Sequence, residues 1–218
     1  MKFTLVTTVW QRPEHLPRLL HCVIQQTHPN WELRIYGDGP QPGVREMLVS
    51  SCSKLGVSDR VDYKELPRKQ GAFGNHLRRA GLEAALGDYV CFLGHDCIID
   101  KDFLAAHMFN IGERADVLSV VTLRYWTKRQ WGSPAVEFAL EEYLTTLPWP
   151  GTQVAELGEG RIDLSCTAYP VAMARRCGVF REAWDQRYAA DAASFTSCMR
   201  DPGCGDVLIN PQIVGAHF

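Results

Sequence analysis

Short apolar runs alternate with helical stretches over the first 125 residues, and this alternation constrains the fold more than any other feature of the chain. The expected strands are 2–8, 31–36, 61–66, 88–93 and 117–123. The expected helices between them are 13–24, 44–55, 75–86 and 101–114. Strands and helices at this spacing imply right-handed crossovers and a mainly parallel sheet covered on both faces. We therefore expect an α/β fold.

Beyond residue 125 the pattern is looser. The segment 161–166 is typical of a strand, 188–200 of a helix, and 207–217 of two short strands around Asn210 and Pro211. No linker, internal repeat or low-complexity tract interrupts the chain. One compact domain over residues 1–218, with a second half added to the α/β part, is the simplest interpretation.

The composition excludes several classes of protein. The 218 residues are 46% hydrophobic and 22% charged, which is ordinary for a globular protein and argues against disorder or a coiled coil. With 23 basic and 25 acidic residues the formal charge is -2, so the chain lacks the basic surface of a non-specific nucleic-acid or membrane binder. No run approaches the roughly 20 apolar residues of a membrane span, and the apolar stretch at residues 1–6 is too short and too soon interrupted to be a signal peptide. We expect no nucleic-acid partner, no integral membrane segment and a cytoplasmic location.

The eight cysteines show no CxxC pair and no dense cluster, and most lie inside apolar runs. A cysteine in such a run behaves as a small buried hydrophobe. Reduced core thiols of a cytosolic enzyme are therefore expected, rather than a disulfide framework or a structural zinc site.

Polar residues follow three of the expected strands, at the sheet edge where parallel sheets bind ligands. Asp96 ends a buried strand, where a carboxylate must be desolvated unless a cation meets it. A Mg²⁺ or Mn²⁺ ion held by one or two carboxylates and substrate phosphates would meet that need, and a helix cap or turn is the alternative. Asp38 lies between two glycines and is either a turn residue or a ligand contact. His95 is either a ligand or a simple hydrogen-bonding group.

Several segments also form a family pattern in the correct order. Residues 8–16, Thr-Val-Trp-Gln-Arg-Pro-Glu-His-Leu, resemble the opening Pro-Thr-Tyr-Asn-Arg-Pro signature of family 2 glycosyltransferases with the GT-A fold. Residues 25–33 match the family's next segment, and 37–39 stand where Asp-Asp-Gly is usual. Residues 87–97 resemble Gly-Asp-Tyr-Ile-x-Phe-Leu-Asp-x-Asp, and 102–104 the acidic-Phe-Leu that follows it. The resemblance covers residues 1–125 well and is looser to the end.

The resemblance implies a three-layer α/β/α sandwich with a mainly parallel mixed sheet. It also implies a metal-dependent hexosyltransferase that moves a sugar from a nucleotide-diphosphate donor, a UDP-sugar by expectation, to an acceptor hydroxyl of a glycan or other molecule. Residues 1–125 would bind the donor and 126–218 the acceptor. A sugar nucleotidyltransferase, another class of enzyme with a parallel sheet, would require a glycine-rich pyrophosphate loop after the first strand, and the sequence has none there.

The resemblance carries over residue by residue to the donor and metal sites. Trp10 stands where a tyrosine normally stacks on the base, and a larger aromatic face stacks at least as well. Gly94 replaces the first aspartate of the Asp-x-Asp metal motif, so Asp96 needs a further ligand from elsewhere in the chain to hold the metal. His217 is where a late histidine fills that role in some relatives, and a C-terminal surface histidine is the alternative. The implied donor-binding residues are Thr8, Trp10, Arg12, Asp38, Arg78, Arg79, His95 and Asp96, where a solvated helix face is the alternative for Arg78 and Arg79.

An inverting transfer needs a general base for the acceptor proton, and the family carries it as an aspartate at the start of a late helix. Asp191 fits, with Ala190 in place of the usual glutamate. The alternative is an acid that merely favours the helix dipole. Asp163 is the second candidate for the base, whereas Glu141 and Glu142 are typical of a helix surface. Because the first aspartate and the glutamate are both missing, a catalytically weakened nucleotide-sugar or glycan-binding module is the alternative function.

Overall fold

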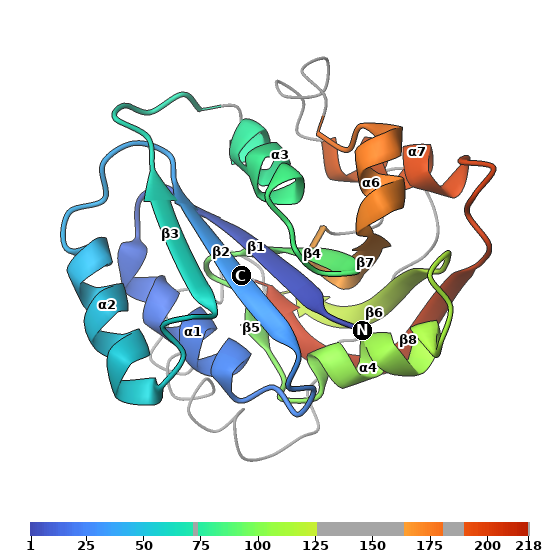
Figure 1. Ribbon diagram of the computed structural model, residues 1–218, viewed down its shortest axis with the longest axis horizontal. Coiled ribbons are helices and arrows are strands. Elements are labelled where there is room, and N and C mark those ends of the chain that lie inside the picture. Colours follow the sequence, from blue (N-terminus) through green and yellow to red (C-terminus); the bar gives the residue numbers. More distant parts are fainter. Residues whose placement is uncertain (72–73, 126–163, 181–189, 218) are drawn as a thin grey trace.

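A computed structural model describes residues 1–71, 74–125, 164–180 and 190–217 of the chain (Figure 1). The strands are β1 (Phe3–Val9), β2 (Trp31–Gly37), β3 (Val61–Glu65), β4 (Tyr89–Gly94), β5 (Ile98–Ile99), β6 (Leu118–Tyr125), β7 (Thr167–Pro170) and β8 (Val207–His217). The helices are α1 (Leu16–Ile24), α2 (Val44–Leu55), α3 (Asn75–Glu83), α4 (Phe103–Ile111), α6 (Val171–Cys177) and α7 (Ala190–Met199). Two 3-10 turns, η1 (Pro13–His15) and η3 (Leu164–Cys166), complete the described elements.

The described strands form one sheet in the order β3-β2-β1-β4-β7-β6-β8-β5. The first four strands run parallel, β6 and β8 are also parallel, and β7 is antiparallel to both of its neighbours. Figure 1 shows α1, α2 and α4 on one face of the sheet and α3, α6 and α7 on the other. The structure therefore confirms the predicted α/β sandwich with a mainly parallel mixed sheet.

The local sequence explains why these elements form. β1 and β4 are almost entirely buried, as expected for strands covered on both faces. In α1, Leu16, Leu19, Leu20 and Val23 recur at helical spacing and are the buried face. Gly81 lets α3 lie directly on β1, because a Cβ at this position would stand 2.4 Å from Cγ1 of Val6. Close helix–sheet packing thus brings the start of α3 to the end of β1.

Two predictions for the second half are wrong in detail. The segment 161–166 is not a strand where it is described: residues 164–166 form η3, and the strand follows as β7. The segment 207–217 is one strand rather than two, and its pairing with β6 passes from Asn210 directly to Ile213. Pro211 has no N–H to donate to a ladder, so the irregularity falls at the residue that suggested a break.

The cysteines agree with a further prediction. All eight cysteines are free, seven of them buried and Cys204 partly so, which confirms their role as core residues. Within the described ranges no helix is long and apolar enough to cross a membrane.

Glu32 is a buried acid that joins β1, β2 and the connection before β4. Its carboxylate accepts hydrogen bonds from Thr4 Oγ1 at 2.7 Å and from the backbone N–H of Leu86 at 2.8 Å. Lys2 and Arg34 form ion pairs with it at 3.2 Å each. Burial alone would raise the pKa of Glu32, but these donors outweigh it and hold the pKa below its usual range. The carboxylate therefore stabilises the sheet in its ionised form.

We expect Glu32→Ala to lower the free energy of unfolding by about 3 kcal/mol, because several buried donors lose their acceptor. Since the folded-state pKa is the lower one, this contribution is complete above the unfolded pKa of about 4.3 and is lost as the pH falls through the folded value. Urea unfolding at pH 7 and at decreasing pH measures both effects. Glu113→Ala, at an exposed glutamate, is the control; an equal loss in both variants would contradict the assignment.

Candidate functional site

The strand order changes direction at β1, which lies between β2 and β4. Thr8 is in register with Tyr36 of β2 on one side and with Gly94 of β4 on the other. The carboxyl ends of the three strands consequently lie side by side. Such a switch point is where open α/β sheets bind ligands. The structure thus brings Trp10, Asp38 and Asp96, which the sequence places after three separate strands, to one edge of the sheet.

Asp38 fixes the connection between β3 and α3 over this edge. The residue is 3% exposed, and its own N–H donates to Val9 O at 2.9 Å. Its Oδ1 accepts from the backbone N–H of Gln70 at 2.8 Å, and Oδ2 from that of Gly71 at 3.0 Å. A carboxylate offers about four acceptor positions, so capacity for a ligand remains. Asp38 therefore anchors this connection and lies within the candidate site.

The same connection approaches the ring of Trp10. Gly39 has φ +96, and a Cβ there would lie 2.8 Å from the backbone nitrogen of Lys69, so only glycine allows the connection to lie this close. The Lys69 ammonium lies 4.0 Å from the centre of the Trp10 ring, which is a cation–π contact. Trp10 remains 36% exposed. An exposed indole beside a cation is a suitable surface for a flat aromatic group.

Thr8 and His76 complete the side of the site formed by α3. A Cβ at Gly74, the residue before α3, would stand 2.9 Å from Thr8 Oγ1. His76 Nε2 is buried and lies 3.9 Å from Asp38 Oδ1. Neither His76 nor Lys69 is among the site residues predicted from the sequence. The signal for them was their place near α3, the helix that also carries Arg78 and Arg79: Lys69 lies in the connection between β3 and α3, and His76 in the first turn of the helix.

Arg12 and Asp96 form an ion pair across the ends of β1 and β4. The Arg12 Nη2 atom lies 3.1 Å from Asp96 Oδ2. The Asp96 side chain is 9% exposed and that of Arg12 is 48% exposed. The carboxylate that sequence reasoning expected to need a cation therefore has one from the chain itself.

Two histidines lie beside this ion pair. The rings of His15 and His95 are 6.3 Å apart, and Nε2 of His95 is buried without a hydrogen-bond partner among the described residues. Burial lowers the pKa of both imidazoles, and the Arg12 guanidinium lowers them further. A neutral His95 can accept or donate a hydrogen bond at the edge of the site.

The structure separates the two arginines of α3. Arg78 is half-buried, donates from Nη1 to Asn75 Oδ1 at 2.9 Å and lies with its guanidinium 5.9 Å from the Phe180 ring. Arg79 is exposed. The two side chains therefore have different surroundings, and the solvated-face alternative describes Arg79 better than Arg78.

The backbone places the two positions expected to hold the metal on neighbouring segments. β5 and β8 are antiparallel with Ile98 opposite Ala216, so His217 follows next to the position of Cys97, one residue from Asp96. One carboxylate and one imidazole on neighbouring segments are a donor set that Mn²⁺ or Mg²⁺ accepts together with phosphate oxygens. No cluster of three or more metal-binding side chains occurs within the described residues, so donor oxygens and water would have to complete the shell.

The candidate bases are placed only in part. Asp191 lies in the first turn of α7, as the prediction of a late helix with an acid at its start requires. The second candidate, Asp163, and the pair Glu141 and Glu142 lie outside the described residues.

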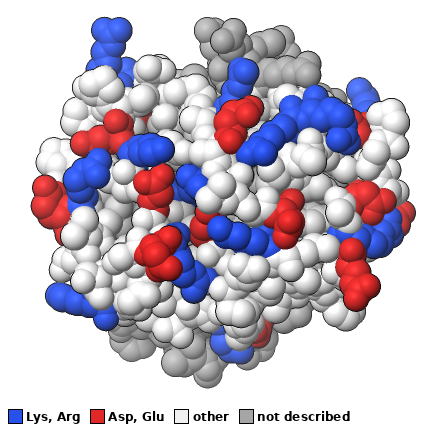
Figure 2. Space-filling view, viewed as in Figure 1, with Lys and Arg blue, Asp and Glu red and all other residues white. Residues whose placement is uncertain are grey.

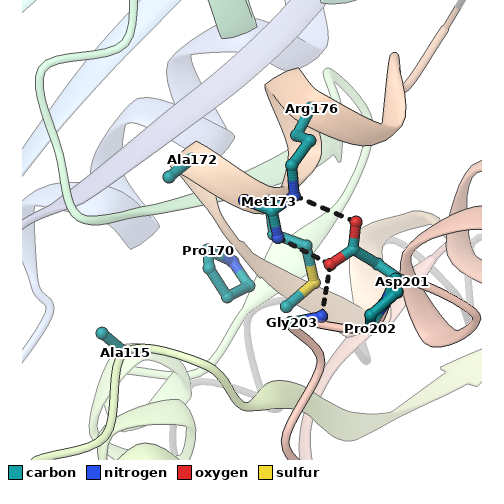
Figure 3. A pocket seen from close by; sticks show the side chains of 8 residues that line it. All are labelled: Ala115, Pro170, Ala172, Met173, Arg176, Asp201, Pro202 and Gly203. Atoms are coloured by element: carbon teal, nitrogen blue, oxygen red, sulfur yellow. Dashed lines mark hydrogen bonds and ion pairs between the residues drawn. The ribbon is translucent and has the colours of Figure 1, made fainter.

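A separate hollow lies at the other end of the parallel strands (Figure 3). It is beside Pro170, which pairs with Tyr89, the first residue of β4. Its volume is about 520 Å³. Arg176 closes one side with two hydrogen bonds to Asp201, at 3.0 and 2.6 Å. Figure 3 shows Met173 and the two prolines lining the rest. This hollow is far from the strand ends that carry the predicted site residues.

Comparison with known families identifies the class of protein. Residues 4–176 match the model of glycosyl transferase family 2, and the chain belongs to that family. The sheet order, the switch point at β1 and the polar strand ends agree with this assignment.

Individual relatives are more distant. The chain is 29% identical over 135 residues to TuaG of Bacillus subtilis, named as a teichuronic acid biosynthesis glycosyltransferase, covering 62% of this chain and 51% of that protein. Residues 1–349 of TarS from S. aureus in complex with UDP share the fold, with a TM-score of 0.72, 14% identity and coverage of 100% of this chain and 60% of that one. The mannosyltransferase PcManGT of Pyrobaculum calidifontis, in complex with GDP-Man and Mn2+, gives a TM-score of 0.71 at 14% identity, with 99% and 56% covered. The chain thus spans about half to three-fifths of the length of these relatives.

Proposed function

We propose that the chain transfers a hexosyl group from a nucleotide-diphosphate donor, a UDP-sugar, to an acceptor hydroxyl with inversion at the sugar carbon. The observation that carries this proposal is the convergence of Trp10, Asp38 and Asp96 at the switch point of β1. An aromatic face, an acceptor for base or ribose and a carboxylate for a cation are the parts that a nucleotide diphosphate requires.

In this proposal residues 1–125 bind the donor and residues 126–218 the acceptor. Trp10 stacks on the base, Thr8 and Asp38 contact base and ribose, and the guanidinium groups of Arg12 and Arg78 contact the diphosphate. Arg79, which is exposed, assists from the helix surface, and His95 bonds the donor at the strand end.

Asp96 and His217 would hold the Mn²⁺ or Mg²⁺ ion. When bound, that ion offsets the charge of the departing diphosphate. Asp191 takes the proton of the acceptor hydroxyl as the new bond forms, which is the step that makes the oxygen nucleophilic. PcManGT, with GDP-Man and Mn2+ bound, supports the metal by analogy of fold.

The charge distribution suits a small anionic ligand rather than a polyanion. Figure 2 shows basic and acidic side chains interspersed over the face in view, in keeping with the formal charge of -2. The diphosphate would be neutralised locally, by Arg12, Arg78 and the ion. We also propose a cytoplasmic location, because eight free thiols persist in a reducing compartment.

A thermal-unfolding screen of nucleotides tests the proposed donor. UDP with Mn²⁺ is expected to raise the melting temperature most, since a ligand at 100 times its Kd adds about 2.7 kcal/mol of stability. GDP, CDP and ADP, each with Mn²⁺, are the matched ligands. No shift with any nucleotide would contradict the proposal, and a larger shift with GDP would replace UDP as the donor.

Stacking on Trp10 gives a further prediction. Trp10→Ala is expected to weaken UDP binding about 5- to 150-fold, because a base stacked on an aromatic side chain gains about 1–3 kcal/mol. Trp10→Phe keeps an aromatic face and should retain most of the affinity. Calorimetry of UDP binding measures both variants. Unchanged affinity in the alanine variant would place the base elsewhere.

A binding module without turnover is the second candidate function. It is favoured by one observation: the single carboxylate of the metal motif is already paired with Arg12. UDP binding without release of UDP from any of a broad panel of donors would establish this alternative.

A further inference from the structure

The Arg12–Asp96 ion pair occupies the one carboxylate that the Asp-x-Asp position retains. The contact is 3.1 Å, and the Asp96 side chain is 9% exposed, so little of the carboxylate faces solvent. Gly94 contributes no side chain where a second acid would stand. Any divalent ion that reaches Asp96 therefore meets a guanidinium already bound there.

The backbone at this point has an uncommon conformation. Gln11 and Arg12 have φ values of 59° and 45°, two consecutive non-glycine residues in the left-handed region. Such residues persist only where surrounding contacts hold them, and they cluster at ligand sites and switch regions. The turn is closed by the N–H of His15, which donates to Arg12 O at 3.2 Å, and by the ion pair itself. Release of the ion pair removes one of these constraints.

We propose that Arg12 is a place-holder for the divalent ion: it neutralises Asp96 in the donor-free chain and moves to the diphosphate when the ion takes the carboxylate. This inference rests on the proposed function, since it requires a metal ion and a diphosphate at the site. It goes beyond that function because it makes Arg12 a competitor of the ion as well as a ligand of the donor.

The physical reason is the cost of unpaired or crowded charge in a nearly buried place. Asp96 without a cation would be a desolvated carboxylate, which is expensive. A guanidinium and a divalent ion on the same carboxylate would repel each other at a few ångströms. The diphosphate resolves this conflict, because it offers the displaced guanidinium a bidentate partner. Asp96 and Arg12 thus each have an oppositely charged partner both before and after the ion and the donor bind.

Coupling between the two ligands follows from this exchange. Binding of the ion alone must break the ion pair, whereas binding of the ion with UDP gives Arg12 a new partner. UDP should therefore raise Mn²⁺ affinity, and Mn²⁺ should raise UDP affinity by the same factor. Without Arg12, the part of this coupling that arises from the exchange disappears.

The test is Mn²⁺ binding to the full chain at low, constant ionic strength, followed by the electron paramagnetic resonance signal of free Mn²⁺ with and without UDP. Arg12→Gln is expected to bind Mn²⁺ about tenfold more tightly than the wild type without UDP, and to gain less from added UDP. The same variant should bind UDP more weakly without metal. A merely structural role for Arg12 would lower both affinities, so a rise in one and a fall in the other is diagnostic.

Two further variants serve as controls. Arg18→Gln removes the same charge from the exposed face of α1 nearby and should leave Mn²⁺ affinity unchanged. Arg12→Lys keeps a cation and should keep most of the competition. The inference would be overturned if Arg12→Gln bound Mn²⁺ no more tightly than the wild type, or if Arg18→Gln showed the same rise in affinity. In either case, binding of UDP and Mn²⁺ by the wild type would still support the proposed donor and metal. Absence of Mn²⁺ binding in wild type and Arg12→Gln alike would overturn both.

Discussion

Asp191→Asn is expected to lower the turnover number by about 10²- to 10⁴-fold while the affinity for UDP stays within a factor of about two. The amide cannot accept the proton of the acceptor hydroxyl, but it has nearly the same size as the carboxylate. Asp191 lies in the first turn of α7, on a different element from the strand ends that we assign to the donor, so donor binding should not depend on it. Initial rates of sugar transfer, together with calorimetry of UDP binding, measure the two quantities.

The control for Asp191→Asn is Asp59→Asn, which makes the same change at an exposed position. It should leave both turnover and UDP binding unchanged. Full activity in Asp191→Asn would contradict its role as the base and would favour Asp163. A parallel loss of UDP affinity would instead indicate damage to the donor site.

Asp96→Asn is expected to reduce sugar transfer by about 10²- to 10³-fold and to abolish measurable Mn²⁺ binding. Asp96 is the only carboxylate left at the Asp-x-Asp position, because Gly94 replaces the other. A metal ion would contribute several kcal/mol to stabilising the charge on the departing diphosphate, so the effect of its loss is large. Transfer rates and Mn²⁺ titration measure the effect.

His217→Ala is the companion of Asp96→Asn. It should weaken Mn²⁺ binding less severely, because the carboxylate remains. If Asp96→Asn kept both Mn²⁺ binding and activity, the ion would be held elsewhere and the site at the end of β4 would have to be reassigned.

Much of the first half could be predicted from local sequence. β1 is rich in β-branched residues, β4 is an almost continuous apolar run, and α1 places its leucines on one face at helical spacing, so the element types follow from side-chain type and period. Gly56, directly after the predicted helix 44–55, ends α2 in the left-handed conformation. The strand-end rule then placed Trp10, Asp38 and Asp96 at one edge without knowledge of any contact.

The remainder depended on contacts between residues far apart in the chain. Arg12 meets Asp96 across 84 positions, and no local pattern announces that pairing. Lys69 reaches Trp10 only because Asp38 holds the backbone of residues 70 and 71 and Gly39 leaves space for it. β8 carries Pro211 within a strand because its partner β6 tolerates a skipped pair. Tertiary structure decided each of these features.

The most direct test of the central claim is release of UDP from a UDP-sugar, measured with Mn²⁺ and then with excess chelator. A panel of UDP-hexoses with sugar and glycan acceptors keeps the assay independent of the particular substrate. Turnover is expected with Mn²⁺, and it should be lost with chelator and recover when Mn²⁺ is restored. Equal rates in both conditions would contradict the metal role, and UDP binding with no release from any donor would contradict the transferase itself.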